Sequence, residues 1–201
     1  LMITILNYGA AAQTYFKYRT DDLMNADLTD EQKAMAWDGS LVRTDWSVPA
    51  AKAGDLVRNA AVVTGGDANL TLLGAINLNF KFSVASNVNV QDAELLIWTE
   101  EDYNALDVLT EDNATMTEAL ELVNGRYEYT YEGVPAKDSF VPVYFCAKFV
   151  DADGNVSYSG IIPYCTERAV YLGLSHSNAD AVALFKCIAI YADAARSFFA
   201  K

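Results

Sequence analysis

The first eighteen residues of this chain return, in altered form, as its last eighteen. Residues 1–18 read LMITILNYGAAAQTYFKY, and residues 184–201 read LFKCIAIYADAARSFFAK. Aligned without a gap, the two segments are identical at Leu1/Leu184, Ile5/Ile188, Tyr8/Tyr191, Ala11/Ala194, Ala12/Ala195 and Phe16/Phe199. A segment that recurs at both ends of one domain is typical of a unit taken from a longer architecture. The repeat is therefore informative about the domain organisation of the protein and says little about its biochemical activity.

Within each copy, the shared apolar positions fall at steps of three and four residues. In the first copy these positions are Leu1, Ile5, Tyr8 and Ala12, followed by the pair Tyr15–Phe16. This spacing places them on one face of an α-helix. We expect the two helices to pack against each other or against matching surfaces of successive units. The alternative is two unrelated amphipathic helices, because alanine-rich helices resemble one another by chance.

Composition and charge narrow the class of protein and its partners. Of the 201 residues, 52% are hydrophobic and 20% are charged, which is typical of a globular chain rather than a disordered one. The formal net charge of −13 repels phosphate groups, so nucleic acid and anionic membrane surfaces are not expected partners. No apolar run approaches the roughly 20 residues of a membrane-spanning helix, so we expect no membrane insertion by this segment.

Cysteine usage gives no sign of a disulfide framework. The three cysteines are Cys146, Cys165 and Cys187, an odd number without any CxxC pair. Their sequence neighbours are mostly apolar, as in YFCAKF and FKCIAI. The pattern favours buried free thiols that pack as small hydrophobic side chains.

Residues 1–55 are expected to form an N-terminal helical segment and a connection. Thr29 and Gln32 have the spacing of a capping box, which predicts a short helix from Asp30 to Trp37. Residues 38–55 contain Gly39, Pro49 and Gly54 among scattered polar residues, so they are expected to be extended and mostly irregular.

From about residue 56 the hydrophobic period changes from helical to strand-like. Ile76, Leu78, Phe80 and Phe82 alternate with polar residues, which predicts a half-buried strand. Further strands are expected at 93–99, 126–132, 140–150 and 156–164, the last two joined by the turn at Asp151–Asn155. Short strands without interleaved long helices favour an antiparallel immunoglobulin-like β-sandwich over residues 56–165.

Helices resume over residues 166–201. A short helix is expected from Thr166 to Leu172, and Ser177 is the expected N-cap of the last helix. The predicted fold class is therefore α+β, with a central sandwich flanked by N- and C-terminal helices. The expected domains are 1–55, 56–165 and 166–201.

Two segments of the chain resemble a recurrent motif of large surface-exposed or secreted proteins from gut Clostridia and their relatives. The matching residues are Tyr8, Gly9, Ala10, Ala11, Ala12, Gln13, Tyr15, Phe16, Tyr18, Thr20, Asp21, Leu23 and Asn25, with residues 156–164 at the far end. Met24 departs from the usual alanine, and the C-terminal copy has Asp193 and Arg196 where the first has Ala10 and Gln13. The resemblance implies an extracellular or cell-surface setting and this layout, but no catalytic or binding residues.

The sequence offers little material for catalysis. His176 is the only histidine, it lies in a polar SHSN segment, and no nucleophile motif accompanies it. Zinc sites need several His or Cys ligands, and Gly65–Gly66 lacks the continuation of a phosphate-binding loop. We therefore expect no enzyme, no cofactor and no bound metal.

Two acidic segments have an interpretation as functional sites and a simpler one. Asp151, Asp153 and Asn155 resemble the start of a calcium loop, but Ile162 stands where the bidentate glutamate belongs. A hairpin turn whose aspartates accept local backbone hydrogen bonds is favoured. The run Glu100–Asp102 after Trp98 could suggest paired glycosidase carboxylates, although a solvated strand end explains it better.

Aromatic residues supply the candidate ligand contacts. Tyr127, Tyr129 and Tyr131 share one strand face and could stack on sugars, but polar Glu128 and Thr130 opposite favour a core-facing row. Trp46, Trp98 and Tyr103 lie near expected loops, so they are the predicted exposed, ligand-contacting aromatics.

These observations favour a non-catalytic module of a bacterial cell-surface or secreted protein, serving as a spacer, adhesion or interaction domain. Its expected partners are other domains of the same protein, or a host or cell-wall ligand of protein or glycan nature. The alternative is a carbohydrate-binding β-sandwich module of a polysaccharide-degrading protein, suggested by the 12% aromatic content.

Overall fold

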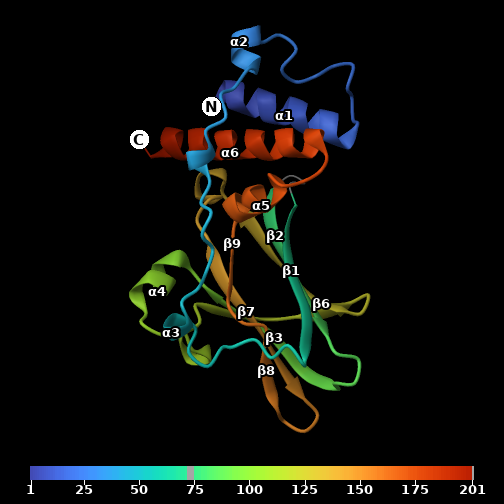
Figure 1. Cartoon of the computed structure of the whole chain (residues 1–201), viewed down its shortest axis with the longest axis vertical. Helices are drawn as coiled ribbons and strands as arrows, with labels where there is room; N and C mark the ends of the chain where they lie inside the picture. The colour runs from blue at the N-terminus through green and yellow to red at the C-terminus, as the bar shows by residue number, and fades with distance from the viewer. Residues whose placement is uncertain (72–74, 201) are drawn as a thin grey trace. The chain divides into compact units, whose positions relative to one another are not determined.

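The structure is a computed structural model that describes residues 1–71 and 75–200. The chain divides into two compact units, each held together by contacts among its own residues (Figure 1). The helical unit comprises Leu1–Asp45, Pro135–Phe140 and Thr166–Lys201, and the β unit comprises Trp46–Val134 and Val141–Cys165. The fold class is α+β with two antiparallel sheets. Residues 46–55, expected with the N-terminal segment, group with the β unit, and residues 135–140 group with the helices.

The two copies of the repeat pack against each other in the helical unit. Helix α1 (Met2–Phe16) and helix α6 (Ala179–Phe199) run antiparallel (Figure 1), and Lys17 Nζ at the end of α1 lies 2.8 Å from Asp180 Oδ2 at the start of α6. Midway, the rings of Tyr8 and Tyr191 stack with centroids 5.8 Å apart and planes 13° apart. Tyr8 and Tyr191 occupy the same position in the repeat, so equivalent faces meet.

The environments of the two helices nevertheless differ. Ile188 on α6 is 5% exposed, whereas its counterpart Ile5 on α1 is 38% exposed. Helix α6 has additional neighbours in α5 (Thr166–Gly173) and the 3₁₀ turn η3 (Ala136–Asp138). Gly173 packs so closely against the Phe185 ring that a Cβ there would overlap it. The backbone N–H of Thr166 donates to the Ser139 carbonyl at 2.9 Å, which ties the start of α5 to the segment containing η3.

The segment after α1 folds back onto that helix. Lys17 adopts a left-handed conformation (φ 56°) that ends α1, and the chain returns along it to α2 (Asp30–Lys33). The Thr29–Gln32 capping box is confirmed, but α2 ends at Lys33 rather than Trp37. At the start of α6, Asn178 rather than Ser177 is the N-cap, because its side chain accepts hydrogen bonds from the backbone N–H groups of residues 180 and 181.

The β unit contains two sheets whose neighbouring strands are all antiparallel. The first sheet has the order β1 (Val63–Thr71), β2 (Ile76–Val84), β6 (Arg126–Val134) and β5 (Glu121–Val123). The second has the order β4 (Met116–Ala119), β3 (Val90–Trp98), β7 (Val143–Asp151) and β8 (Val156–Tyr158), and β9 (Ile162–Tyr164) also pairs with β7. Helices α3 (Ala50–Ala53) and α4 (Glu100–Ala105) and the 3₁₀ turn η2 (Glu111–Asn113) complete the unit; η1 (Gly39–Leu41) belongs to the helical unit.

A layer of phenylalanines joins the inner faces of the two sheets. Phe80 and Phe82 on β2 face Phe145 on β7, with ring centroids 4.1 and 6.1 Å away, and Phe149 lies 6.3 Å from Phe82. These four side chains are essentially inaccessible to solvent. Tyr127 also packs edge-on against Phe149, at 5.2 Å, which supports the inward orientation predicted for the tyrosine row of β6.

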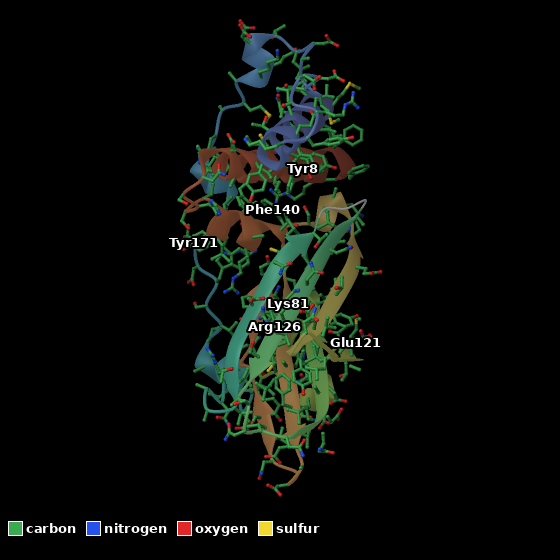
Figure 2. The ribbon with its side chains drawn as sticks, turned by 90° about the vertical axis from the view of Figure 1, so that its right-hand side faces the viewer. Tyr8, Lys81, Glu121, Arg126, Phe140 and Tyr171 are labelled. Carbon is green, nitrogen blue, oxygen red and sulfur yellow. The ribbon has the colours of Figure 1, made fainter. Side chains whose placement is uncertain are left out.

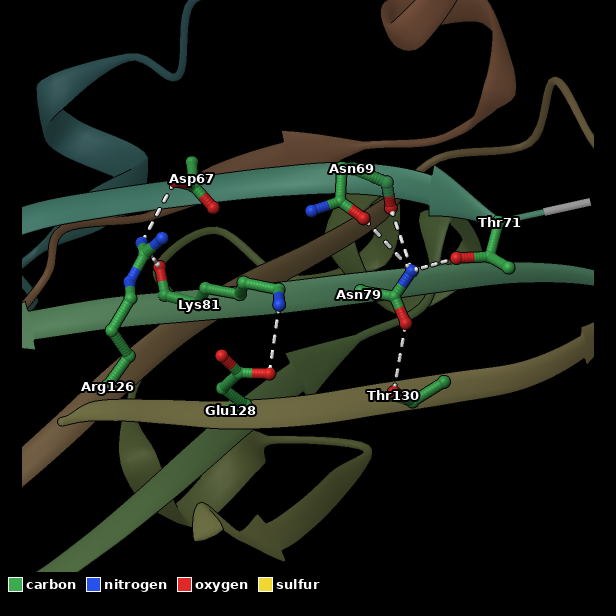
Figure 3. A network of polar contacts seen from close by, with 8 residues as sticks. All are labelled: Asp67, Asn69, Thr71, Asn79, Lys81, Arg126, Glu128 and Thr130. Atoms are coloured by element: carbon green, nitrogen blue, oxygen red, sulfur yellow. Dashed lines mark hydrogen bonds and ion pairs between the residues drawn. The ribbon is translucent and has the colours of Figure 1, made fainter. Parts of the chain in front are cut away.

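The opposite face of the first sheet is polar. Figure 3 shows an amide ladder in which Asn79 on β2 donates to Asn69 Oδ1 at 3.1 Å and to Thr71 Oγ1 at 2.7 Å on β1. On the other side, Thr130 of β6 donates its hydroxyl hydrogen to Asn79 Oδ1 at 3.0 Å. One asparagine thus links three strands across the face.

Ion pairs extend this polar face along the same strands. Lys81 Nζ lies 3.0 Å from Glu128 Oε2, and Arg126 Nη2 lies 2.9 Å from Asp67 Oδ2 (Figure 3). Figure 2 shows Lys81 and Arg126 together on this face of the sheet. The charged side chains here are engaged with one another, which suits a solvated outer sheet surface.

Around Trp98, the outer face of the second sheet is apolar and covered. Leu96, Trp98, Tyr144 and Cys146 point outward from β3 and β7 and join Leu56 and Leu109, which come from the covering loops, in one buried cluster. Strand β7 is therefore buried on both faces. This explains its nearly continuous apolar sequence, which differs from the strict alternation of a strand with one solvated face.

Candidate functional site

One depression in the surface of the β unit combines polar groups with an aromatic residue. It lies above the covered face of the second sheet. It has a volume of about 450 Å³ and is lined by residues 54–56, residues 108–112 and Tyr158. Leu56 and Leu109 belong both to its lining and to the buried cluster beneath. The depression is thus built on a packed floor, while its rim carries the side chains of Asp55, Glu111 and Asp112.

Local structure fixes the two loops that form the rim. Gly54, with φ 55°, ends α3 and leaves no room for a Cβ beside Val108. The backbone N–H of Leu109 donates to the Lys52 carbonyl at 2.9 Å and joins the loops. Asn113 Oδ1 accepts from the Thr110 backbone N–H and from the Trp98 indole N–H, both at 2.9 Å. Trp98 thus anchors the loop from beneath.

A network of hydrogen bonds and ion pairs lies at one side of the depression. The Tyr158 hydroxyl donates to Glu111 Oε1, and Lys148 Nζ lies 2.5 Å from Glu111 Oε2 and 3.4 Å from Glu94 Oε2. Burial tends to raise the pKa of Glu111, but hydrogen bonds from Lys148 and Tyr158 outweigh it and lower that pKa. Burial, followed by the neighbouring Glu111 carboxylate, raises the pKa of Tyr158. At neutral pH this network therefore consists of the Glu111 carboxylate, the neutral Tyr158 phenol and the Lys148 ammonium group.

We expect Glu111→Gln to weaken the fold at neutral pH and to have little effect in acid. A carboxylate with a lowered folded-state pKa stabilises the protein above its ordinary pKa, and this contribution disappears as the pH falls through the folded-state value. Urea unfolding of wild type and variant at pH 7 and pH 3 measures the difference. Asp112→Asn, on the exposed neighbouring residue, is the matched control. A deficit of the same size at both pH values would contradict the role given to the charge of Glu111.

The prediction that Trp98 is exposed is wrong. Its side chain is 0% exposed, because residues 46–58 and 106–114 contribute side chains that cover this face of the sheet. Tyr103 is half-buried, stacked on Tyr144 with centroids 3.6 Å apart, and the Lys52 ammonium lies 4.9 Å from its ring. Trp46 is half-buried. The structure brings Trp98 and Tyr103 into one cluster, and ligand contact by Trp46 and Tyr103 stays a prediction.

The sequence did not single out the residues of the depression. Thr110 and Asn113 form a capping box at η2, a signal that was readable in the sequence. Glu100–Asp102, interpreted as a strand end, instead form the first turn of α4, with Thr99 as N-cap. Hydrogen bonds from Thr115 and Thr99 lower the pKa of Asp102. These carboxylates stabilise a helix start and do not form a facing pair.

The segment Asp151–Asn155 is a hairpin turn, as predicted. Asp151 Oδ1 accepts hydrogen bonds from the backbone N–H groups of Asp153 and Asn155, each at 2.9 Å. The Asn155 amide donates to both Asp151 oxygens, and Gly154 adopts φ 81°. The Asp151 carboxylate therefore already has local donors.

Calcium is accordingly expected to leave the stability of the chain unchanged. Thermal unfolding curves recorded in millimolar calcium and in excess chelator should coincide, because binding would require Asp151 to give up its backbone partners. An upward shift of several degrees in calcium, absent in Asp153→Ala, would show instead that this turn is a ligand loop.

The nucleophilic and metal-ligating side chains are dispersed. Burial raises the pKa of the Cys146 thiol to about 12, so it is a poor nucleophile at neutral pH. His176 Nδ1 accepts from the Asn178 backbone N–H at 3.0 Å in an exposed loop. Among residues 1–71 and 75–200, no group of three or more His, Cys, Asp or Glu side chains could hold a metal ion.

A second depression lies in the helical unit. Its volume is about 470 Å³, and its lining includes Trp37, Val42, Tyr171, Leu172 and Leu174. Figure 2 marks Tyr171, which is partly exposed. Among the described residues, none that lines this second depression is charged, so it offers no charged group to orient a polar ligand. The depression beside Tyr158 is therefore the better candidate site.

Comparisons with known proteins give little further guidance. No family model matches the chain, and no curated protein matches it. One solved structure with similarity is the Br derivative of BhCBM56, with a TM-score of 0.34 and 11% identity over 49% of this chain and 88% of that one. At that TM-score, the likeness carries no argument about this chain. Within the described parts of the chain, no helix has the length and apolar character needed to cross a membrane.

Proposed function

We propose that this chain is a non-catalytic interaction module of a bacterial cell-surface or secreted protein. The observation that carries the proposal is the pairing of the two repeat copies, α1 and α6, into one antiparallel layer. The motif resemblance to surface proteins of gut Clostridia supports the extracellular setting. The polar, charge-paired face of the first sheet suits a module exposed to solvent on a cell surface.

Three observations support a non-catalytic role. The buried Cys146 thiol has a raised pKa, the sole histidine lies in an exposed loop, and the Glu111 carboxylate is engaged by Lys148 and Tyr158. A reducing-end assay on a panel of polysaccharides tests the proposal. We expect no sugar release above the heat-unfolded control. Release that grows with time and in proportion to protein concentration would contradict the non-catalytic assignment.

The second candidate function is carbohydrate binding by an immunoglobulin-like β-sandwich, and the depression beside Tyr158 favours it. Glycan sites combine an aromatic surface with a few polar groups that hydrogen-bond hydroxyls. Here Tyr158, Thr110 and the exposed carboxylates of Asp55 and Asp112 supply such groups. The acidic rim would suit neutral or amino sugars and would repel uronic acids.

A glycan array discriminates the two functions. The variant Asp55→Asn/Asp112→Asn changes the rim without touching the buried floor, and Asp92→Asn, an exposed carboxylate on β3, is the control. If the first proposal holds, we expect no saturable glycan binding that is lost in the Asp55→Asn/Asp112→Asn variant. Saturable binding by wild type and Asp92→Asn that is lost in the double variant would instead establish the carbohydrate-binding function.

A further inference from the structure

Equivalent residues of the two repeat copies meet at the centre of the α1–α6 interface. Tyr8 and Tyr191 are equivalent in the repeat, and their rings stack nearly parallel. Within each copy, the closing aromatic pair also packs edge to face: Tyr15–Phe16 at 4.9 Å and Phe198–Phe199 at 5.2 Å, with Phe16, Phe198 and Phe199 largely exposed. An interface in which equivalent patches meet around a two-fold axis is of the kind that builds symmetric dimers.

The segment from α1 to Lys33, which we call the arm, satisfies its own buried polar groups. Gln13 on α1 donates to the Asp22 carbonyl at 2.9 Å and accepts from the Met24 backbone N–H at 2.7 Å. Asn7 donates to the Gln32 carbonyl at 2.7 Å. Both amides are nearly inaccessible to solvent. The arm can therefore separate from α6 without leaving these buried amides unpaired.

A short link connects the arm to an anchored segment. Residues 34–36 form neither helix nor strand. Beyond them, the Trp37 ring lies 5.7 Å from the Lys186 ammonium on α6, and the Arg43 backbone N–H donates to Glu167 Oε1 at 2.6 Å on α5. Residues 34–36 are thus the link in which the chain could change direction between the arm and the anchored segment. Short links of this kind favour exchange of an element between copies.

We propose that the arm is exchangeable and that its alternative partner is α6 of a second copy of this chain. In the exchanged dimer, each α1 packs on the other copy's α6 with the same stacked tyrosines and the same Lys17–Asp180 ion pair. The closed monomer is favoured in dilute solution because its two helices are tethered, and exchange becomes competitive as local concentration rises. The inference rests on the helix pairing and is independent of any glycan or catalytic role.

A cross-linking experiment distinguishes exchanged from closed pairing. Lys17→Cys and Asp180→Cys place thiols at the ion pair, and Cys187→Ser removes the half-buried native thiol, while Cys146 and Cys165 stay buried. A flexible bis-maleimide then joins α1 to the α6 on which it packs. On a denaturing gel, the closed form gives a covalent monomer and the exchanged form a covalent dimer. The Lys17→Cys/Cys187→Ser protein is the control for random cross-linking between molecules.

Removing Met35 and Ala36 shortens the link and should convert most of the protein to covalent dimers. With the link intact, we expect the dimer fraction to rise with protein concentration and to exceed the control. A shortened protein that stays monomeric would overturn the proposal. Dimers in solution that run as covalent monomers on the denaturing gel, because each cross-link lies within one chain, would also overturn it. Should the shortened protein not fold, the concentration series decides: a dimer fraction no greater than the control at any concentration overturns the proposal.

Discussion

Replacing Phe145 with alanine is expected to cost about 3 to 5 kcal/mol of unfolding free energy, the range for truncating a buried large aromatic. Phe145 is 0% exposed and lies at the centre of the layer that joins the two sheets. Its ring lies 4.1 Å from Phe80 and 6.1 Å from Phe82, so alanine would leave a cavity between β2 and β7. Neighbouring rings belong to paired strands and cannot collapse freely into that space.

Urea unfolding followed by far-ultraviolet circular dichroism measures this loss. The matched control is Leu122→Ala on β5, whose side chain is 63% exposed and which should change stability by no more than about 0.5 kcal/mol. If Phe145→Ala cost no more than the control, the two sheets could not be packed through this layer.

Trp98→Ala is expected to have an effect of similar size, about 3 to 5 kcal/mol, for a different structural reason. Its indole fills the outer cluster of the second sheet, and its N–H holds Asn113 at 2.9 Å. Truncation would open a cavity beneath residues 108–112 and release the loop that lines the candidate site. Loss of ligand binding in this variant would thus report loss of structure, and the Asp55 and Asp112 variants are the appropriate probes of the site.

Chemical denaturation monitored by tryptophan fluorescence and circular dichroism tests this expectation. Trp98→Phe keeps most of the aromatic volume and removes the N–H, so it should fall between wild type and alanine. Wild-type stability in Trp98→Ala would show that the indole does not pack in this cluster and would restore its place among the exposed aromatics.

The parts of the fold that could be predicted depend on local pattern. The alternation of Ile76, Leu78, Phe80 and Phe82 predicted β2, since one face of that strand is buried and the other solvated. The Thr29–Gln32 capping box and the turn at Asp151–Asn155 were predicted because their hydrogen bonds are made within a few residues. The repeat predicted two helices with a common face, and they pack on each other.

The candidate site could not be predicted because it depends on contacts between distant segments. Trp98 lies beside a loop in the sequence, yet Leu56 and Leu109 arrive from elsewhere in the chain and bury it. Tyr158 reaches Glu111 across 47 positions, a pairing that no local pattern contains. Similarly, η3 lies between two strands in sequence but belongs to the helical unit.

A double-mutant cycle on Tyr8 and Tyr191 tests most directly whether the repeated helices close on each other through equivalent faces. Unfolding free energies are measured for wild type, Tyr8→Ala, Tyr191→Ala and the double variant. Stacked aromatic pairs couple by about 0.5 to 1.5 kcal/mol, so the double variant should lose less stability than the two single losses combined by that amount. Additive losses would contradict the pairing of α1 with α6.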